Sequence, residues 1–487
     1  MLNKRFFIVS VIAALVFVIS DSIFSYYQFT DFCLDGDLSS IVAPCKAYSK
    51  ILHNPLGTSI FLNHERYAAT NRFFLHWSIY LYFNKAPLFL QSLGVSPIES
   101  IYMACALIKI SVQLLFVLIL SMIVKQLSSQ RNIYILFLSV IFLSLFQTNG
   151  YDGQMGIIDR SAVYFFAYGL PMLVFLIFLY PYIYYYVNKK MLGNRWLTMI
   201  LLLFLGYIIP FDGSLMCGIV SVFLLVLILS ILITQIRKHR KKGIIQTFEI
   251  VSNVPVQLSL PLVVIGFFSL YSFYIGTFNM ENEWVFLSIS ERYKLLPLGL
   301  FYILTKRLGF PILIILSTVN TFFVFKNASV EIVVKLKFVL KSLAFFALVY
   351  VLLLPLGGYR SYRMYIIRYD TFIPVTICFF LYYAYSTLIV IQIANYRFKL
   401  LFISILILCI SIFTLVDANR EYQNENEKKA FMILSHSQTN NVDLNCNCNV
   451  FSWEPPVNYS SSYESALLLK RWHVTKSVIL YRTKINK

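Results

Sequence analysis

Long uninterrupted apolar runs recur along the whole chain, and they constrain its fold more than any other feature. Most of them hold about 17 residues or more, enough to cross the hydrocarbon core of a bilayer as a helix. We expect eleven such helices, at 6–26, 99–124, 133–148, 161–187, 196–211, 213–235, 256–278, 309–325, 338–356, 371–394 and 400–417. A β-barrel would instead show short segments of alternating hydrophobicity. The sequence therefore predicts an all-α polytopic membrane protein.

The composition agrees with this fold class. Hydrophobic residues make up 59% of the 487 residues and charged residues 13%, and the mean hydropathy is +0.72. A soluble protein of this length needs more charged surface. The net charge of +19 does not indicate nucleic acid, because most Lys and Arg lie in short connectors and no basic run is long enough to follow a phosphate backbone. The first apolar run lacks a small-residue cleavage site, so we expect it to be retained as a helix.

Charge alternates between successive connectors, and this alternation orients the chain. With a cytoplasmic N-terminus, the cytoplasmic connectors are basic, including the densest run at 237–242, and the opposite connectors hold most of the acids. We expect a transmembrane domain at 1–417, with a long first external loop at 27–98, and a small external C-terminal cap at 418–487. The segment 210–214 is either a tight turn between two helices or a break in one.

The first external loop opens with three carboxylates, Asp31, Asp35 and Asp37. Gly36 lets the backbone turn sharply between the second and the third, so two carboxylates can face one point. A partly desolvated carboxylate at a membrane interface can act as a general base or bind a divalent cation. The alternative is a solvated turn in which Asp only caps the backbone. A second acidic patch in the next external connector contains Asp152 and Asp159.

Cations occur at two places where the positive-inside rule does not explain them. Three of them lie in an external connector: Arg360, Arg363 and Arg368. Their forked donors suit the phosphate of a lipid-linked donor, and pairing with acids or lipid headgroups is the alternative. Lys109 lies alone inside the second apolar run, roughly 15 Å deep at helical rise. It either reaches a ligand phosphate or pairs with an acid such as Asp212.

Other motifs narrow the function further. The sequence contains no Walker loop, no Gly-x-Ser-x-Gly and no His-Glu-x-x-His, which argues against ATP-driven transport and common hydrolases. Four of the eight cysteines fall on the external side, where disulfides can form: Cys33, Cys45, Cys446 and Cys448. The sequence leaves open whether they pair. No His lies at zinc-ligand spacing from Cys446 and Cys448.

Residues 35–57 resemble the first external loop of GT-C glycosyltransferases. Their sequence, DGDLSSIVAPCKAYSKILHNPLG, has paired acids, then an interfacial helix that carries a Tyr, and it ends in Asn-x-x-Gly. The resemblance covers about residues 1–190 in detail and the rest in architecture. The familiar Asp-Asp or Asp-Glu pair is Asp-Gly-Asp here, which leaves the catalytic acid open. Asp35 is the first choice, Asp37 the second and Asp31 the third.

The resemblance implies an enzyme of a bacterial inner membrane that uses a polyprenyl-phosphate-linked sugar. One acid is then the general base on the hydroxyl of a glycan, lipid or protein acceptor, and the lipid phosphate leaves with inversion at the sugar carbon. Asp152 or Asp159 orients the acceptor or a divalent cation, and the three arginines, with Lys109, hold the phosphate. The alternatives are an O-antigen or capsule polysaccharide polymerase and a lipid-linked glycan flippase or secondary transporter.

Overall fold

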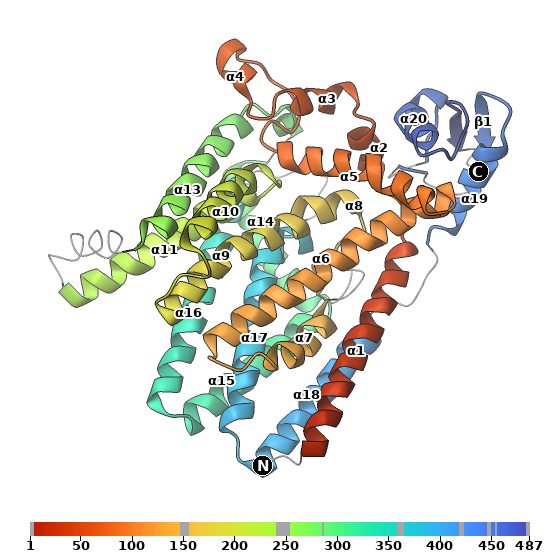
Figure 1. Ribbon diagram of the computed structural model, residues 1–487. Helices are drawn as coiled ribbons and strands as arrows, with labels where there is room; N and C mark the ends of the chain where they lie inside the picture. Colours follow the sequence, from red (N-terminus) through yellow and green to blue (C-terminus); the bar gives the residue numbers. More distant parts are fainter. Residues whose placement is uncertain are drawn as a thin grey trace.

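The computed structural model describes residues 4–146, 155–239, 254–284, 287–357, 365–417, 423–445, 450–452 and 455–483. Most of these residues are helical, and the described strands are two short ones near the C-terminus. Most of the long helices lie side by side in one bundle, and the first-loop helices and the C-terminal segment gather at one end of it (Figure 1). The predicted all-α polytopic class is confirmed at this level.

Nine of the described helical segments are long and apolar enough to cross a membrane. They are α1 (Lys4–Thr30), α6 (Pro97–Leu127), α8 (Ala162–Tyr164) continuing through η1 (Phe165–Gly169) into α9 (Leu170–Asn188), α11 (Met216–His239), α13 (Val256–Gly276), α15 (Gly309–Asn327), α16 (Val330–Leu353) continuing into η5 (Leu354–Gly357), α17 (Tyr369–Ile393) and α18 (Tyr396–Val416). Two further apolar helices are shorter, α7 (Tyr134–Leu145) and α10 (Arg195–Ile208). These two helices lie at the expected spans 133–148 and 196–211, which are the two shortest of the eleven. The count of eleven spans stays a prediction.

Helix α17 forms the centre of the bundle. In its most apolar part 89% of the residues are buried, and it packs against α6, α7, α15 and α16. Few residues of α1 and α18 are buried along their apolar windows, and large aliphatic side chains such as Ile12 and Leu408 project outward from these helices. An apolar exposed surface of this kind suits lipid rather than water. The central helix is therefore surrounded by protein, whereas α1 and α18 lie at the periphery.

The first loop folds into four helices, α2 (Gly36–Val42), α3 (Lys46–His53), α4 (Thr58–Asn63) and α5 (Phe73–Ser92). Helix α5 packs on α6, and α2 and α3 pack on α5. Gly57 precedes α4 with φ of 67°, a left-handed conformation that glycine adopts without steric cost. The loop is thus an ordered layer at the end of the bundle.

The segment 210–214 is a turn between two helices. Helix α10 continues into η2 (Ile209–Phe211), and α11 begins at Met216. A Cβ atom on Gly213 would lie 2.6 Å from the carbonyl oxygen of Ala167, so only glycine permits this close approach. The turn is thereby held against η1, and the following residue, Ser214, reaches the cavity described below.

The C-terminal segment folds as a cap on the first loop. It contains α19 (Glu425–His436), β1 (Asn441–Leu444), η6 (Tyr459–Ser462), α20 (Tyr463–Arg471) and β2 (Leu480–Thr483), and the two strands pair in parallel with Asn441 opposite Leu480. The buried Trp472 indole donates from Nε1 to the Phe83 carbonyl at 2.7 Å. Figure 1 shows the cap beside α2 and α5. First loop and cap therefore lie at the same end of the molecule.

The connection between α13 and α15 also reaches this end. It contains η4 (Met280–Trp284) and α14 (Ile289–Thr305). The Met280 backbone N–H donates to the Tyr67 carbonyl at 3.2 Å, and the Asn279 side chain accepts from the Ala69 backbone N–H at 3.0 Å. These bonds fix η4 beside the start of α5, which brings Glu281 close to Arg72.

Candidate functional site

A polar cavity of about 250 Å³ lies where the first-loop helices meet the ends of the spans. Its walls come from α2, α3, α5, α8, η1, the α10–α11 turn, η4, η5 and the start of α17. Ten polar side chains of the described residues line it: Asp37, Tyr48, Arg72, His76, Tyr164, Tyr168, Ser214, Glu281, Asn282 and Thr371. Because it combines charged groups with tyrosine rings at the edge of an apolar bundle, this cavity is the best candidate for the functional site.

The structure separates the two carboxylates of the Asp-Gly-Asp motif. Asp37 lies in the first turn of α2 and lines the cavity. Asp35 precedes α2, is 5% exposed, and accepts a hydrogen bond at Oδ2 from the Val163 backbone N–H at 3.2 Å. Burial and the neighbouring Asp37 charge raise the pKa of Asp35 to about 6. Asp35 thus anchors the start of α8, and Asp37 is the acid that reaches the cavity.

Asp31 lies at the junction of the first loop with the cap. Its side chain is buried, and its carbonyl accepts from the Asn424 backbone N–H at 3.1 Å. The Cys33 thiol lies nearby and donates to the Gln423 carbonyl at 2.9 Å. Cys33 and Cys45 are free, whereas Cys446 and Cys448 lie outside the described residues. Loop and cap are therefore joined here by hydrogen bonds.

Lys109 and Asp159 form a buried group behind the cavity. Lys109 is 2% exposed, and its Nζ donates to the Arg160 carbonyl. Asp159 accepts at Oδ1 from the Ser161 backbone N–H at 2.7 Å, and burial, followed by the charge of Asp370, raises its pKa to about 7. The carboxylates that act on Lys109 are Asp159 and Asp35, and Asp212 is not among them. Lys109 and Asp159 thus hold the segment before α8, away from the cavity lining.

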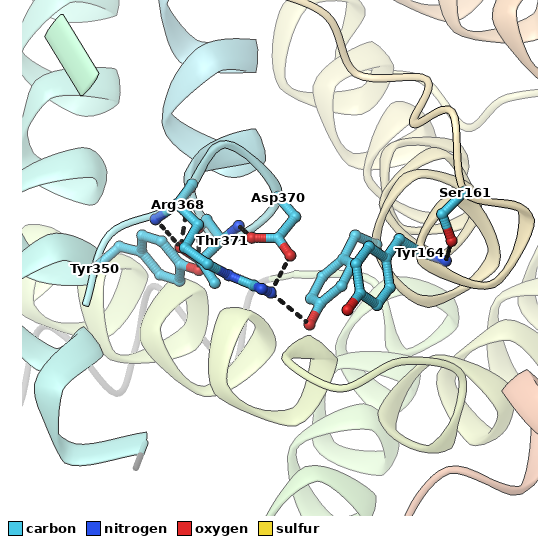
Figure 2. Close-up of polar contacts among 7 residues, drawn as sticks. Ser161, Tyr164, Tyr350, Arg368, Asp370 and Thr371 are labelled. Atoms are coloured by element: carbon cyan, nitrogen blue, oxygen red, sulfur yellow. Dashed lines mark hydrogen bonds and ion pairs between the residues drawn. The ribbon is translucent and has the colours of Figure 1, made fainter. Parts of the chain in front are cut away.

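Arg368 lies at the start of α17 (Figure 2), and it donates hydrogen bonds to residues that line the cavity. Its guanidinium pairs with Asp370 and donates to the Tyr168 hydroxyl at 3.4 Å. Its backbone N–H donates to Thr371 Oγ1 at 2.9 Å. Tyr168 and Thr371 both line the cavity, and the Tyr350 hydroxyl donates to the Thr371 carbonyl at 2.8 Å. Arg368 therefore controls the position of two cavity-lining side chains.

Three expected site residues, Asp152, Arg360 and Arg363, lie outside the described residues. Within the described part of the chain, no group of three or more His, Cys, Asp or Glu side chains is arranged to hold a metal ion. We therefore assign no residue to a divalent cation.

Sequence reasoning missed a set of four cavity-lining residues, which we name the Arg72–Glu281 cluster: Tyr48, Arg72, His76 and Glu281. Arg72 Nη1 donates to Glu281 Oε2 at 2.9 Å, and the Tyr48 hydroxyl donates to Glu281 Oε1 at 3.0 Å. The His76 and Tyr48 ring centroids are 4.8 Å apart. Burial and the adjacent Arg72 charge lower the pKa of His76 to about 3, so the imidazole is neutral.

Part of this cluster had a signal in the sequence. Arg72 and His76 are four residues apart, a spacing that places both side chains on one face of a helix. Glu281 follows 209 residues after Arg72, and nothing in the local pattern connects the two. The pairing depends on how η4 packs against α5, which is a property of the tertiary fold.

Comparison with protein-family models, with curated proteins and with solved structures gives no match for this chain. A function for the cavity therefore has to follow from the chemistry of the residues around it.

Proposed function

We propose that the chain is a membrane glycosyltransferase. It moves a sugar from a polyprenyl-phosphate-linked donor to a glycan, lipid or protein acceptor of the cell envelope, on the external face of the membrane. The observation that carries the proposal is the position of Asp37, a carboxylate on the wall of a polar cavity between the first loop and the spans. The charge of the connectors favours placing this end of the bundle outside.

Asp37 is the general base in this proposal. Its carboxylate takes the proton of an acceptor hydroxyl, and the hydroxyl oxygen attacks the anomeric carbon of the sugar. The bond from that carbon to the phosphate oxygen breaks, and the lipid phosphate leaves with the electron pair. Asp37 ends the step protonated, and the sugar carbon is inverted. Asp35, which was the first choice from the sequence, supports α8 instead, because its carboxylate accepts the Val163 N–H.

Arg368 is the candidate for contact with the donor phosphate. It lies beside Tyr168 on the side of the cavity formed by the start of α17. A guanidinium presents planar forked donors that match phosphate oxygens. Arg360 and Arg363 belong to the same connector, and their part in phosphate binding stays a prediction.

The size and place of the cavity favour this function over the alternatives. A volume of about 250 Å³ is below the roughly 300–1,000 Å³ of pockets that hold drug-sized ligands, so it suits one sugar ring better than the oligosaccharides that a polymerase joins. A secondary transporter binds its substrate near the midplane of the membrane. This cavity instead lies where the first-loop helices meet the ends of the spans.

The test is a transfer assay on purified protein in lipid vesicles, with a panel of radiolabelled polyprenyl-phosphate sugars. We expect one donor class to support transfer, and Asp37→Asn to slow it by about 10²–10⁴-fold, the usual contribution of a general base. Glu291→Gln is the matched control, because Glu291 is an exposed carboxylate that caps α14. Transfer by Asp37→Asn at the wild-type rate, or no transfer from any donor by the wild type, would overturn the proposal.

A further inference from the structure

Helix α2 contacts the cavity on one side and the cap on the other. Asp37 and Ile41 both line the cavity, and they are four residues apart, so they lie on the same face of the helix. Ser39 follows Asp37 by two residues, which places it about 200° around the helix. The Ser39 hydroxyl accepts from the Ser465 hydroxyl of α20 at 3.2 Å. The helix that carries the proposed base therefore lies between the cavity and the cap.

Two more hydrogen bonds from the cap fix the chain just before α2 and at its last residue. The Glu427 carboxylate accepts from the Leu34 backbone N–H at 3.0 Å. Arg471 Nη1 donates to the Val42 carbonyl at 2.8 Å. The last carbonyls of a helix have no partner within the helix, and the helix dipole favours a cation beside them. Together with the serine pair, these bonds hold α2 to the cap at three points along its length.

Helix α2 depends on such contacts because it is short and weakly capped. It has seven residues, fewer than the roughly 12–15 that an isolated helix needs in water. Its N-cap residue, Asp35, makes no side-chain capping bond. It packs chiefly against α5 and α20, and Asn84 of α5 also donates to the Val42 carbonyl, at 3.2 Å. Removal of the contacts with α20 should therefore loosen α2, although α5 still supports it.

We propose that the cap positions the general base: its docking orders α2 and thereby keeps the Asp37 carboxylate on the cavity wall. This inference rests on the proposed function and adds Ser465 and Arg471 as positioning residues. The described residues of the cap do not line the cavity, and in this account the cap acts on the reaction through α2. Its effect should fall on the rate of transfer more than on donor binding, because the proposed phosphate contact, Arg368, belongs to the start of α17.

The first test measures the order of α2 and needs no substrate. The double variant Ser465→Ala/Arg471→Ala removes both bonds from α20 to α2, together with the Arg471 bond to Asn84. The Trp472 indole still bonds to α5 and keeps α20 in place. We expect hydrogen exchange at the backbone amides of α2 to accelerate by about fivefold to a hundredfold.

Two readings make this exchange measurement specific. The amides of α19 should keep their wild-type protection, which shows that the cap remains folded and docked. Lys470→Ala is the matched control, because Lys470 is an exposed residue of the same helix, and it should leave α2 unchanged. Wild-type exchange of α2 in the double variant would overturn the inference.

Transfer kinetics in lipid vesicles give the second test. The double variant should lower kcat by at least about tenfold, because a small misplacement of a reacting group has a large effect on rate. The KM for the donor should stay within about twofold of the wild-type value, since the donor contacts are unchanged. Lys470→Ala should keep both constants. A loosened α2 with wild-type kcat, or a rise in KM alone, would overturn the positioning role.

A reversible crosslink separates positioning from a general loss of structure. The Ser39 and Ser465 hydroxyls are in contact, so Ser39→Cys and Ser465→Cys are introduced together with Arg471→Ala. Oxidation should join the two thiols and restore both the protection of α2 and kcat, and reduction should remove both again. Wild-type protein taken through the same redox cycle controls for the native cysteines. A crosslinked protein, identified by mass spectrometry, that does not regain kcat would contradict the proposal.

The two proposals fail in different ways. If the wild type transfers no sugar from any donor, the glycosyltransferase is rejected, and the exchange measurement still decides whether the cap orders α2. If the wild type transfers sugar and the double variant does so with the same kcat despite a loosened α2, the enzyme stands and the positioning role is rejected.

Discussion

A single carboxylate in the cap, that of Glu427, joins three parts of the molecule. Glu427 is 2% exposed; its Oε2 accepts from the Leu34 backbone N–H at 3.0 Å and from the Tyr102 hydroxyl at 2.8 Å, and its Oε1 accepts from the Phe451 backbone N–H at 3.3 Å. Leu34 belongs to the first loop, Tyr102 to α6 and Phe451 to the cap. Glu427→Ala would leave these three buried donors unpaired in the docked state, at a cost of about 1–3 kcal/mol each. We therefore predict that this substitution undocks the cap.

The same carboxylate makes cap docking dependent on pH. Burial raises the pKa of Glu427 to about 7 from its ordinary 4.5. At pH values between the ordinary 4.5 and about 7, Glu427 is protonated in the docked state and ionised in the undocked state. Docking therefore weakens as the pH rises through this range, and it changes little above about pH 7. The difference corresponds to on the order of 3 kcal/mol at most, or about a hundredfold in the docking equilibrium. Burial also raises the pKa values of Asp35 and Asp159, which adds a pH dependence of the same sign to global unfolding.

Hydrogen exchange at the backbone amides of α19 measures this equilibrium directly, once the rates are corrected for the intrinsic effect of pH. We expect protection to fall by about tenfold to a hundredfold between about pH 5 and about pH 8. Glu427→Gln cannot titrate and should show a clearly smaller fall. A wild-type protein with constant protection, or a Gln variant with the full wild-type slope, would refute the reasoning.

Three further predictions concern residues around the cavity. Lys109→Met leaves the buried Asp35 and Asp159 without their cation and should destabilise the protein by about 3–5 kcal/mol, measured by thermal unfolding in detergent; a melting temperature equal to wild type would contradict it. Asp35→Asn keeps an acceptor for the Val163 N–H, so it should retain measurable transfer under conditions where Asp37→Asn has none; inactivity of both would return Asp35 to the candidate bases. Arg368→Lys should weaken donor binding by about tenfold to a hundredfold, as Arg368→Ala does, because an ammonium lacks the fork; full rescue by Lys would leave only nonspecific pairing with headgroups.

The sequence was sufficient for the fold class but not for the choice of acid. Long apolar runs identify spans because a backbone in lipid has to satisfy its own hydrogen bonds, and the described helices lie close to the expected ranges. Asp35 and Asp37 are two residues apart, and which one faces the cavity depends on where α2 begins. Helix α2 packs against α5 and α20, and no local pattern reveals these contacts.

The sequence also did not predict which residues pair over long distances in the chain. Lys109 was expected either at a phosphate or beside Asp212, and it lies instead against the Arg160 carbonyl, with Asp35 and Asp159 as its acidic neighbours. The Arg72–Glu281 pair joins positions 209 residues apart. A burial preference can be read from residue type, but the partner of a buried charge follows from tertiary packing.

The central claim is that the transferred sugar occupies the cavity beside Asp37, and photocrosslinking tests it most directly. A polyprenyl-phosphate sugar with a photoreactive group on the ring is bound to the purified protein, irradiated, and mapped by peptide mass spectrometry, with unlabelled donor as competitor. We predict competable crosslinks to cavity-lining residues of α2, α3, α5 and η4, including Tyr48, His76 and Asn282. Competable crosslinks confined to the peripheral helices α1 and α18, with none in the cavity, would contradict the account.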